Sequence, residues 1–257
     1  MLEQLFQAAA ADAAEREKNL PFNALAERCD ELENPISAYQ ALSKSSSVKL
    51  IAEIKRASPS RGKLAEIVDP ADQGAGYEKA GAHAISVLTE RTGFQGSLSD
   101  LELVSAAVDI PTLRKDFISN EYQILEAKAA GASMVLLILA QLQLTDFQRL
   151  YEFAHAIGLE VLVETHSEAE IEVAATNQSK LIGINTRDLT TFKTDIGLFE
   201  RMAALLPADA IRVAESSVRG IEDVRRYRDA GADVVLVGEA LVTGDYERLI
   251  PQIVAVS

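Results

Sequence analysis

The chain has 257 residues, of which 48% are hydrophobic and 25% charged, and this length allows one large core or two small domains. Its 39 acidic and 25 basic residues leave a net charge of −14, which argues against a nucleic-acid partner or an anionic membrane surface, because both need a basic face. No apolar run is long enough to span a bilayer and the N-terminus does not resemble a secretory signal, so we expect a cytoplasmic protein.

The first 47 residues precede the first predicted strand and form an N-terminal extension. The sequence predicts helices at 2–18 and about 23–32, a break at Asn34-Pro35 and a short polar connector at 43–47. Cys29 is the only cysteine, which excludes an internal disulfide or a thiolate metal site, so we expect it to be a small buried apolar residue. Two interpretations of the extension stay open, a helical cap over one end of the fold and a lid over an active site.

The most informative stretch of the chain runs from 50 to 62. A short apolar run normally forms a buried strand, but this one contains Glu53 and Lys55 near its end and breaks at Ser58-Pro59. Residues two apart point to the same side of a strand, so these charges must pair with each other or face a polar ligand. Charged strand ends of this kind are where parallel α/β folds build active sites.

A short sequence motif recurs along the rest of the chain. The tripeptide Ala-Gly-Ala at 80–82, 130–132 and 230–232 precedes a continuous apolar run each time, as expected where a helix ends at a left-handed glycine and a buried strand follows. With the other apolar runs, eight strands are predicted at 50–54, 84–88, 111–113, 134–138, 160–163, 181–184, 211–214 and 234–237. Helices are predicted between them, for example at 121–130, 144–157, 168–175 and 221–230, with N-terminal signals at Asp146 and Ser167.

Eight strands alternating with helices favour a single closed (β/α)8 barrel over 48–257, behind the extension at 1–47. A doubly wound open sheet is the competing fold, and eight strands in a chain of this length favour closure. The three histidines, at 83, 155 and 166, show no close metal-ligand spacing, and His83 is expected to be structural.

Polar or glycine residues stand at seven of the eight predicted strand ends, which meet at one rim of such a barrel. In chain order these ends carry Glu53 and Lys55; Thr89 and Glu90; Lys115; Glu164; Asn185 and Arg187; Glu215, Ser216 and Ser217; and Gly238 with Glu239. Only the fourth end, at 139–141, carries no ionisable group. Any one of these ends is weak evidence, but together they predict a polar pocket.

The last two strand ends suggest a phosphate ligand. Loops after the seventh and eighth strands of such barrels commonly bind phosphate through backbone N–H groups and a helix N-terminus, and here they contain Ser216, Ser217, Gly220 and Gly238. Lys55 could neutralise the anion from the other side of the ring. The alternative is that both loops are ordinary turns between a strand and a helix, with no ligand.

Lys115 and Glu164 are the acid–base candidates. A partly desolvated lysine at a strand end can donate a proton or polarise a carbonyl, and a nearby carboxylate can act as the base. The alternative is a structural salt bridge between the two, or with Glu53, and spacing alone does not decide between them.

These segments together resemble the indole-3-glycerol-phosphate synthase family. The matching segments are IAEIKRASPS (51–60), SVLT (86–89), FQGS (94–97), RKDFI (114–118), LVE (162–164), INTRDL (184–189), AES (214–216) and VGEAL (237–241). The resemblance implies a TIM barrel with a helical N-terminal extension. It also implies decarboxylating, dehydrating ring closure of 1-(2-carboxyphenylamino)-1-deoxyribulose 5-phosphate to indole-3-glycerol phosphate in tryptophan biosynthesis, with no cofactor and no metal.

The resemblance also implies a role for each site residue. Lys115 would be the general acid on the substrate carbonyl oxygen, Glu164 the general base, and Glu53 an assistant in proton handling. The substrate would be bound by Lys55, Ser58, Phe94, Phe117, Asn185, Arg187 and Glu215, and its phosphate by Ser216, Ser217, Gly238 and Glu239. We expect a monomer that acts on this small phosphorylated molecule, with no nucleic-acid or membrane partner.

Two positions depart from the family pattern. The family commonly has glycine where this chain has Ser217, and frequently asparagine where it has Thr186. Neither change removes a side chain with a chemical role, but Ser217 affects the detail of the phosphate loop. Two rival functions are a phosphate-binding isomerase barrel of the same pathway, which would not need Lys115 together with Glu164, and a non-catalytic barrel, which would tolerate the loss of the charged strand ends.

Overall fold

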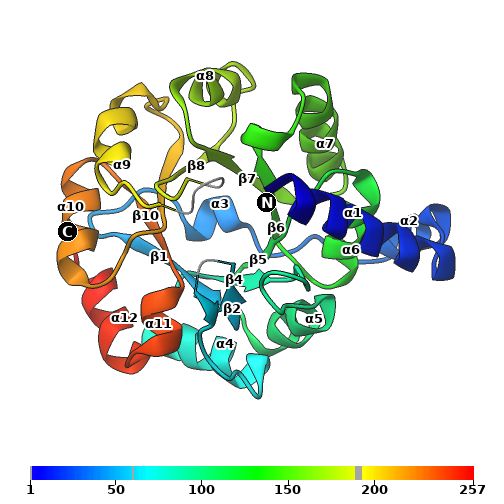
Figure 1. Cartoon of the computed structure of the whole chain (residues 1–257), viewed down its shortest axis with the longest axis horizontal. Helices are drawn as coiled ribbons and strands as arrows, with labels where there is room; N and C mark the ends of the chain where they lie inside the picture. The colour runs from blue at the N-terminus through cyan, green and yellow to red at the C-terminus, as the bar shows by residue number, and fades with distance from the viewer. Residues whose placement is uncertain (1, 60, 189–192) are drawn as a thin grey trace.

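The computed structural model describes residues 2–59, 61–188 and 193–257, so Ser60 and Leu189, which close two of the matching segments, lie outside the described residues. Eight parallel strands form a closed barrel in the order β1-β10-β9-β8-β7-β6-β5-β4, as Figure 1 shows. They are β1 (Lys49–Ile54), β4 (Ala84–Leu88), β5 (Thr112–Lys115), β6 (Met134–Ile138), β7 (Glu160–Thr165), β8 (Leu181–Asn185), β9 (Ile211–Glu215) and β10 (Val234–Val237). The predicted (β/α)8 barrel is confirmed.

Helices form an outer ring around the strands (Figure 1). They are α4 (Pro70–Ala80), α5 (Leu98–Ala107), α6 (Glu121–Ala129), α7 (Leu144–Ala156), α8 (Glu168–Thr176), α9 (Gly197–Met202), α10 (Ile221–Asp229), α11 (Glu239–Thr243) and α12 (Tyr246–Val254), with 3-10 turns at Leu139–Gln141 and Ala203–Leu205. Their apolar faces and the outward-facing strand residues make one continuous core. The glycines of the three repeats have φ of 111°, 83° and 97°, which confirms the predicted left-handed helix ends.

Local capping signals explain where several helices begin. Ser167 accepts a hydrogen bond from the backbone N–H of Glu170, so α8 begins where the sequence predicts. Asn120 caps α6 in the same way through Gln123 N–H. α7 begins at Leu144 as predicted, and Asp146 lies in its first turn, where an acidic side chain is favoured.

Four strands continue one or two residues beyond their predicted ends, to Lys115, Thr165, Asn185 and Glu215. A polar or charged residue seemed to end each apolar run, but inward-facing side chains at the carboxyl end of a barrel line a polar cavity, where such residues are tolerated. The short hairpin formed by β2 (Ala57–Ser58) and β3 (Gly62–Lys63) was not predicted from the sequence.

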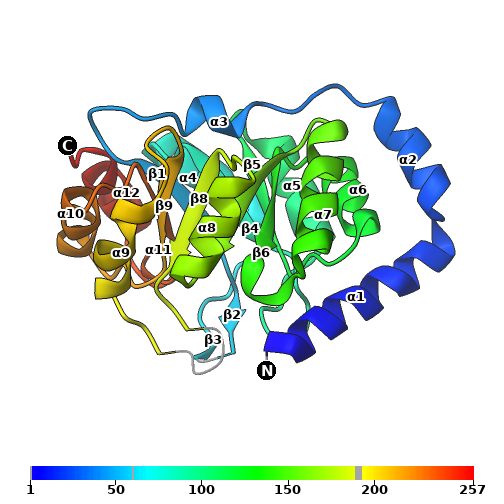
Figure 2. The same ribbon diagram turned by 90° about the horizontal axis from the view of Figure 1, so that it is seen from above.

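The N-terminal helices reach both ends of the barrel. They are α1 (Leu2–Asn19), α2 (Phe22–Asp30) and α3 (Ala38–Ala41), and Figure 2 shows α1 at the end that carries the β2–β3 hairpin and α3 at the opposite end. Ala38 and Leu42 pack with residues that begin the strands, such as Ala84 and Met134, so α3 closes that end. Phe6 of α1 packs at the other end, beside the cavity described next.

Candidate active site

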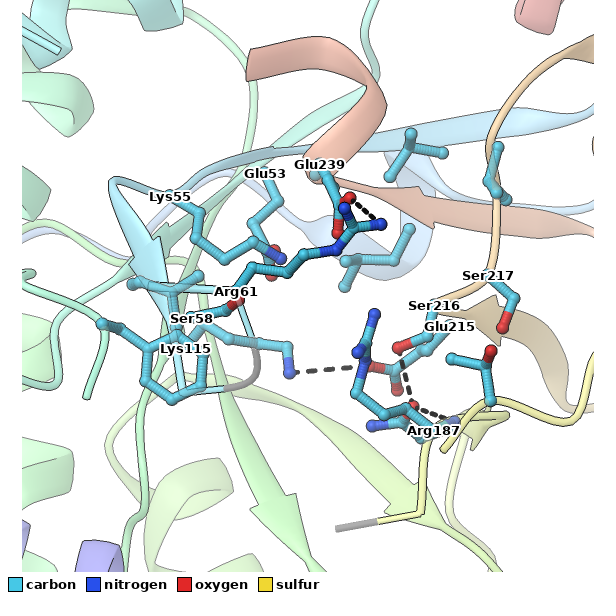
Figure 3. A pocket seen from close by; sticks show the side chains of 18 of the residues that line it. Glu53, Lys55, Ser58, Arg61, Lys115, Arg187, Glu215, Ser216, Ser217 and Glu239 are labelled. Carbon is cyan, nitrogen blue, oxygen red and sulfur yellow. Dashed lines mark hydrogen bonds and ion pairs between the residues drawn. The ribbon is translucent and has the colours of Figure 1, made fainter. Parts of the chain in front are cut away.

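The carboxyl ends of the strands surround a cavity of about 670 Å³. All fourteen site residues predicted from the sequence line it, and nine of them are among the ten residues labelled in Figure 3. The predicted residues are Glu53, Lys55, Ser58, Phe94, Lys115, Phe117, Glu164, Asn185, Arg187, Glu215, Ser216, Ser217, Gly238 and Glu239. Strand closure therefore gathers into one place side chains that are up to 186 positions apart in the sequence.

Glu53 and Lys55 form the ion pair that their spacing suggests. Lys55 Nζ lies 2.6 Å from Glu53 Oε1, and both side chains are largely buried. Because β1 and β10 are neighbours, Lys55 lies beside Gly238, not across the ring as expected. A Cβ at Gly238 would lie 2.3 Å from Glu53 Oε1 and 3.1 Å from Lys55 Nζ, so the missing side chain of this glycine leaves room for the pair.

Lys115 is surrounded by carboxylates at the centre of the cavity. Its Nζ lies 3.3 Å from Glu164 Oε2 and 3.7 Å from Glu215 Oε2 (the Glu215 contact is drawn in Figure 3), and each glutamate is 1% exposed. Space for Glu215 depends on Gly183 in β8, where a Cβ would lie 2.0 Å from Glu215 Oε1. The sequence did not reveal this dependence, since Gly183 looks like an ordinary residue of a buried strand.

The charges in this cluster shift one another's pKa. Burial lowers the pKa of Lys115, but Glu164, Glu215 and Glu53 outweigh it and raise it above its usual value, so Lys115 is an ammonium ion. Burial raises the pKa of Glu164, but Lys115 and His166 outweigh it and hold it below its usual value. Burial and the neighbouring Glu164 charge raise the pKa of Glu215 well above its usual value. The opposite shifts make Glu164 the more readily ionised and Glu215 the more readily protonated of the two carboxyl groups beside the lysine.

Aromatic rings form an apolar wall of the cavity. The Phe94 and Phe117 ring centroids are 6.0 Å apart, and Phe6 from α1 meets Phe117 edge-on at 5.3 Å. Leu136 and Leu236, which lie in the middle of β6 and β10, add to the apolar lining. The cavity thus has a charged centre beside a surface suited to a flat apolar group.

The loop after β9 has an unusual backbone. Ser216 and Ser217 have φ of 69° and 64°, the left-handed region in which glycine is favoured. Ser217 Oγ lies 2.7 Å from Thr186 Oγ1, so the two positions that depart from the family pattern are bonded to each other. Ser216 Oγ donates to Asn185 Oδ1 at 2.8 Å. Two side-chain hydrogen bonds to the β8 end thus hold this loop.

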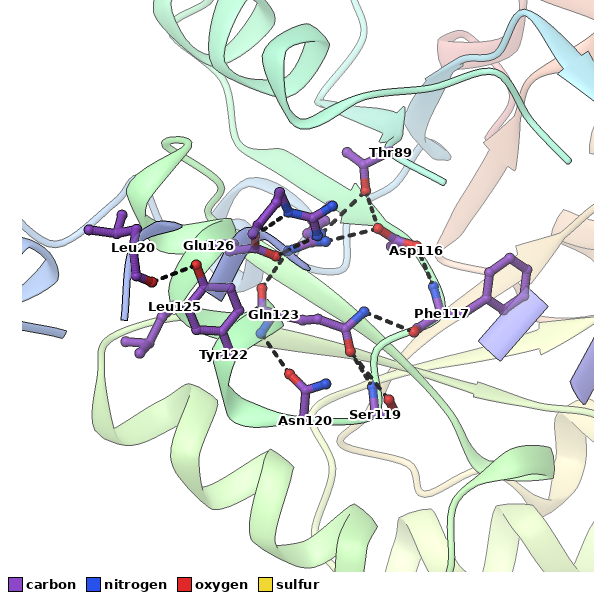
Figure 4. Close-up of polar contacts among 12 residues, drawn as sticks. Leu20, Thr89, Asp116, Phe117, Ser119, Asn120, Tyr122, Gln123, Leu125 and Glu126 are labelled. Atoms are coloured by element: carbon purple, nitrogen blue, oxygen red, sulfur yellow. Dashed lines mark hydrogen bonds and ion pairs between the residues drawn. The ribbon is translucent and has the colours of Figure 1, made fainter. Parts of the chain in front are cut away.

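A buried ionic network holds the strand end that carries Lys115 (Figure 4). Arg114 is fully buried and donates to Asp116 Oδ2 at 2.9 Å, to Glu126 Oε2 at 3.3 Å and to the Gln123 carbonyl at 2.5 Å. Asp116 Oδ1 accepts the backbone N–H of Phe117 at 2.8 Å. Since residues 114 and 116 face outward into this network, Lys115 between them faces the cavity.

The structure adds cavity residues that the sequence reasoning missed. Arg61, after the first strand, pairs with Glu239 at 2.9 Å across the cavity mouth, and Lys193 and Arg219 also line the rim. All three lie in loops after strand ends, so scanning the loops, and not only the strand ends, would have found them.

No group of His, Cys, Asp or Glu arranged to hold a metal ion occurs among the described residues. In the same part of the chain, no helix is long and apolar enough to cross a membrane.

Comparison with known proteins identifies close relatives. The family model described as indole-3-glycerol phosphate synthase matches residues 2–252. The chain is 51% identical to an indole-3-glycerol phosphate synthase from Leifsonia xyli subsp. xyli, over 95% of this chain and 94% of that protein. It is 49% identical to indole-3-glycerol phosphate synthase 1 from Streptomyces coelicolor, over 95% and 90% of the two chains.

A solved structure shows a similar fold at low sequence identity. Thiamine phosphate pyrophosphorylase from Pyrococcus furiosus superposes with a TM-score of 0.60 at 14% identity, over 80% of this chain and 93% of that one. At that identity the likeness concerns the barrel alone.

Proposed function

Because the chain belongs to the indole-3-glycerol phosphate synthase family, we propose that its cavity closes the indole ring with Lys115 as general acid and Glu164 as general base. The enzyme is a carboxy-lyase of tryptophan biosynthesis that converts 1-(2-carboxyphenylamino)-1-deoxyribulose 5-phosphate to indole-3-glycerol phosphate, releasing carbon dioxide and water. The observation that carries the residue roles is the buried Lys115–Glu164 pair at the centre of the cavity, 3.3 Å apart.

The first step needs an acid. When the aromatic carbon attacks the ketone, negative charge develops on the carbonyl oxygen, and a donor at that point lowers the barrier. Lys115 carries the required proton because its pKa is raised. The side chains of Glu164, Glu215 and Glu53 around the ammonium group also fix its position before the substrate arrives.

The later steps need a base. Loss of carbon dioxide restores the aromatic ring, the hydroxyl leaves as water, and the remaining proton must be removed. Glu164 is ionised because Lys115 and His166 hold its pKa down, so it can accept that proton. The Glu53 carboxylate, 2.6 Å from Lys55, is the second proton-handling group of the proposal.

The remaining residues bind the substrate. Phe94 and Phe117 form a surface on which the aromatic ring of the substrate can lie. Ser58 Oγ is buried without a hydrogen-bond partner among the described residues, as expected of a hydroxyl that a ligand completes. Lys55 and Arg187 supply positive charge for the two anionic groups of the substrate.

The phosphate is assigned to the loops after β9 and β10. Left-handed residues at Ser216 and Ser217 turn the backbone at the cavity wall, where N–H groups can bind an anion. Lys55 lies beside Gly238 and supplies a cation at the same place. The substrate would thus span the cavity from the phenylalanine wall to these two loops.

A direct assay tests the proposal. Purified protein incubated with the phosphorylated anthranilate substrate is expected to form indole-3-glycerol phosphate, followed by the appearance of indole absorbance and fluorescence. Folded protein that binds the substrate and releases no product would refute the assignment. A crystal soaked with product would locate the phosphate, and an anion found away from the Ser216–Ser217 amides would refute that part.

A further inference from the structure

His166 is a buried ionisable group next to the base, and the proposed roles leave it without a task. It follows the end of β7, two residues after Glu164, so the two side chains lie on the same side. His166 Nε2 lies 3.4 Å from Glu164 Oε1, and Nδ1 lies 3.5 Å from Glu170 Oε2. The ring thus stands between two carboxylates, with its side chain 14% exposed.

The contact satisfies atoms that are otherwise unpaired. Glu164 Oε1 and both ring nitrogens of His166 are buried and have no hydrogen-bond partner of good geometry among the described residues. The other oxygen of Glu164 faces Lys115. Isolated buried polar atoms are costly, so an attraction of opposite charges between Nε2 and Oε1 accounts for the arrangement.

Glu170 is fixed in place by the start of α8. Ser167 Oγ donates to Glu170 Oε1 at 2.9 Å, and the backbone N–H of His166 donates to Glu170 Oε2 at 2.8 Å. The Glu170 N–H in turn donates to Ser167 Oγ at 3.3 Å, which caps the helix. The outer carboxylate therefore cannot turn away from the imidazole without breaking the helix cap.

We propose that His166 is a positioning residue for the base: as an imidazolium between Glu170 and Glu164, it holds the Glu164 carboxylate ionised and aimed at the cavity. Each oxygen of the Glu164 carboxylate would then pair with one cation, Oε2 with Lys115 and Oε1 with His166. The proposal rests on the proposed role of Glu164 as the base, and it assigns a task to a group outside the fourteen predicted site residues.

The charges that face His166 favour this state. Glu164 comes from β7, Glu170 from α8 and Lys115 from β5. Burial and Lys115 lower the pKa of His166, but Glu170 and Glu164 outweigh them and raise it above its usual value. Burial instead lowers the pKa of His83 to about 4, and it also lowers that of His155. The three histidines of the chain should therefore titrate in separate ranges.

A nuclear magnetic resonance titration tests the charge without any enzyme assay. With the three imidazoles labelled with nitrogen-15, we expect one ring, assigned by His166→Gln, to stay charged to a higher pH than the other two. In Glu164→Gln the pKa of this ring should fall, because one of its two anions is gone. A His166 ring that is neutral at pH 6, or whose titration ignores Glu164→Gln, would overturn the proposal.

Kinetics test the consequence for the base. His166→Gln keeps a hydrogen-bond donor but no charge, so the pKa of Glu164 should rise and the acid limb of the kcat/KM profile should move to higher pH. We expect kcat to fall on the order of 10-fold to 10²-fold, as for a misplaced reacting group, with little change in KM. His155→Gln, a change at the histidine of α7, is the matched control and should leave the profile unmoved.

A second variant guards against misfolding. Glu170→Gln keeps His166 and removes its outer anion, so the acid limb should move in the same direction by a smaller amount. A folded His166→Gln or Glu170→Gln enzyme with an unshifted profile would reject the positioning role. The titration could also find His166 charged and coupled to Glu164 while Glu164→Gln turns over normally. That result would confirm the ion pair but refute the role of Glu164 as the base, and with it the positioning role of His166.

Discussion

The buried cluster at the ends of β5, β7 and β9 depends on single residues. Lys115 supplies both a proton and the positive charge that Glu164 and Glu215 face. Lys115→Met removes both, and we expect kcat to fall on the order of 10²–10⁴-fold, as for loss of a general acid, with a much smaller change in KM. Steady-state kinetics on protein with an unchanged circular dichroism spectrum would measure this.

Lys115→Arg is the control for charge. Arginine keeps the cation but does not release its proton in this pH range, so the variant should be as slow as Lys115→Met while melting at a higher temperature. Turnover restored by arginine would mean that position 115 contributes only charge.

The two glutamates beside Lys115 should respond oppositely to the same substitution. Glutamine imitates a protonated carboxyl group, which is the state that the raised pKa of Glu215 favours. Glu215→Gln is therefore expected to keep kcat within a few-fold, whereas Glu164→Gln loses the base and falls on the order of 10²–10⁴-fold. Measuring kcat and melting temperature for both variants checks this, and equal losses of turnover would contradict the different roles given to the two glutamates.

At the scale of elements, the loop after β9 combines strain with a compensating bond. A non-glycine residue in the left-handed region costs about 1 kcal/mol, and the Ser217–Thr186 hydrogen bond contributes about as much. Ser217→Gly removes both, so the free energy of unfolding should hardly change, and substrate affinity should change by about a kcal/mol or less.

Ser217→Ala separates the two effects, because it removes the hydroxyl and keeps the strain. We expect it to lower the free energy of unfolding by about 1 kcal/mol, measured by urea titration. If alanine and glycine at this position were equally stable, the loop would carry no strain.

The junction of α1 with α6 is the second element that can be tested. Arg16 donates to both oxygens of the buried Glu126 at 2.5 and 2.9 Å, and Glu126 also meets Arg114. Because Arg16 is 40% exposed, Arg16→Met should cost only about 1 kcal/mol, less than a fully buried charged pair, and lower the melting temperature by roughly 2–4 °C. Lys18→Met, which removes an exposed pair in the same last turn, should change neither quantity.

Strands and long helices could be predicted because their pattern is local. Continuous apolar runs and left-handed glycines mark each helix-to-strand junction regardless of the rest of the chain. The positions of Lys115 and Glu164 followed from the barrel rule that strand ends converge. The need for glycine at positions 183 and 238 could not be predicted from local pattern. The side chains that occupy the space of the missing Cβ atoms come from other strands of the barrel. The role of His166 could not be predicted for a similar reason. Its partner Glu170 lies beside the imidazole only because the start of α8 places it there.

At the scale of the whole molecule, the charge of the cavity differs from that of the chain. The net charge is −14, whereas six basic residues line the cavity against five acidic ones, of which Asp116 is already paired with Arg114 behind the cavity wall. The basic residues are Lys55, Arg61, Lys115, Arg187, Lys193 and Arg219, and the acidic ones are Glu53, Asp116, Glu164, Glu215 and Glu239. An anionic substrate is thus repelled at a distance and attracted locally, which makes the rim cations important for capture.

Arg219→Gln tests this capture. We expect kcat/KM to fall by about 2–5-fold at low salt through KM, with kcat unchanged, and the defect to fade above about 0.1 M salt, where the screening length is about 10 Å. Arg225→Gln changes the net charge equally on the outer side of α10, at an exposed pair with Glu222, and should have no such effect. Equal defects in both variants would assign the effect to net charge.

The single cysteine gives this fold an internal reporter. Cys29 belongs to α2 and is 1% exposed, and its Sγ donates to the Leu125 carbonyl of α6 at 3.4 Å. A thiol reagent can reach that sulfur only after α2 has lifted from the barrel. The labelling rate, divided by the rate for the same thiol in the unfolded chain, would therefore count how often the N-terminal helices detach while the barrel behind them stays closed.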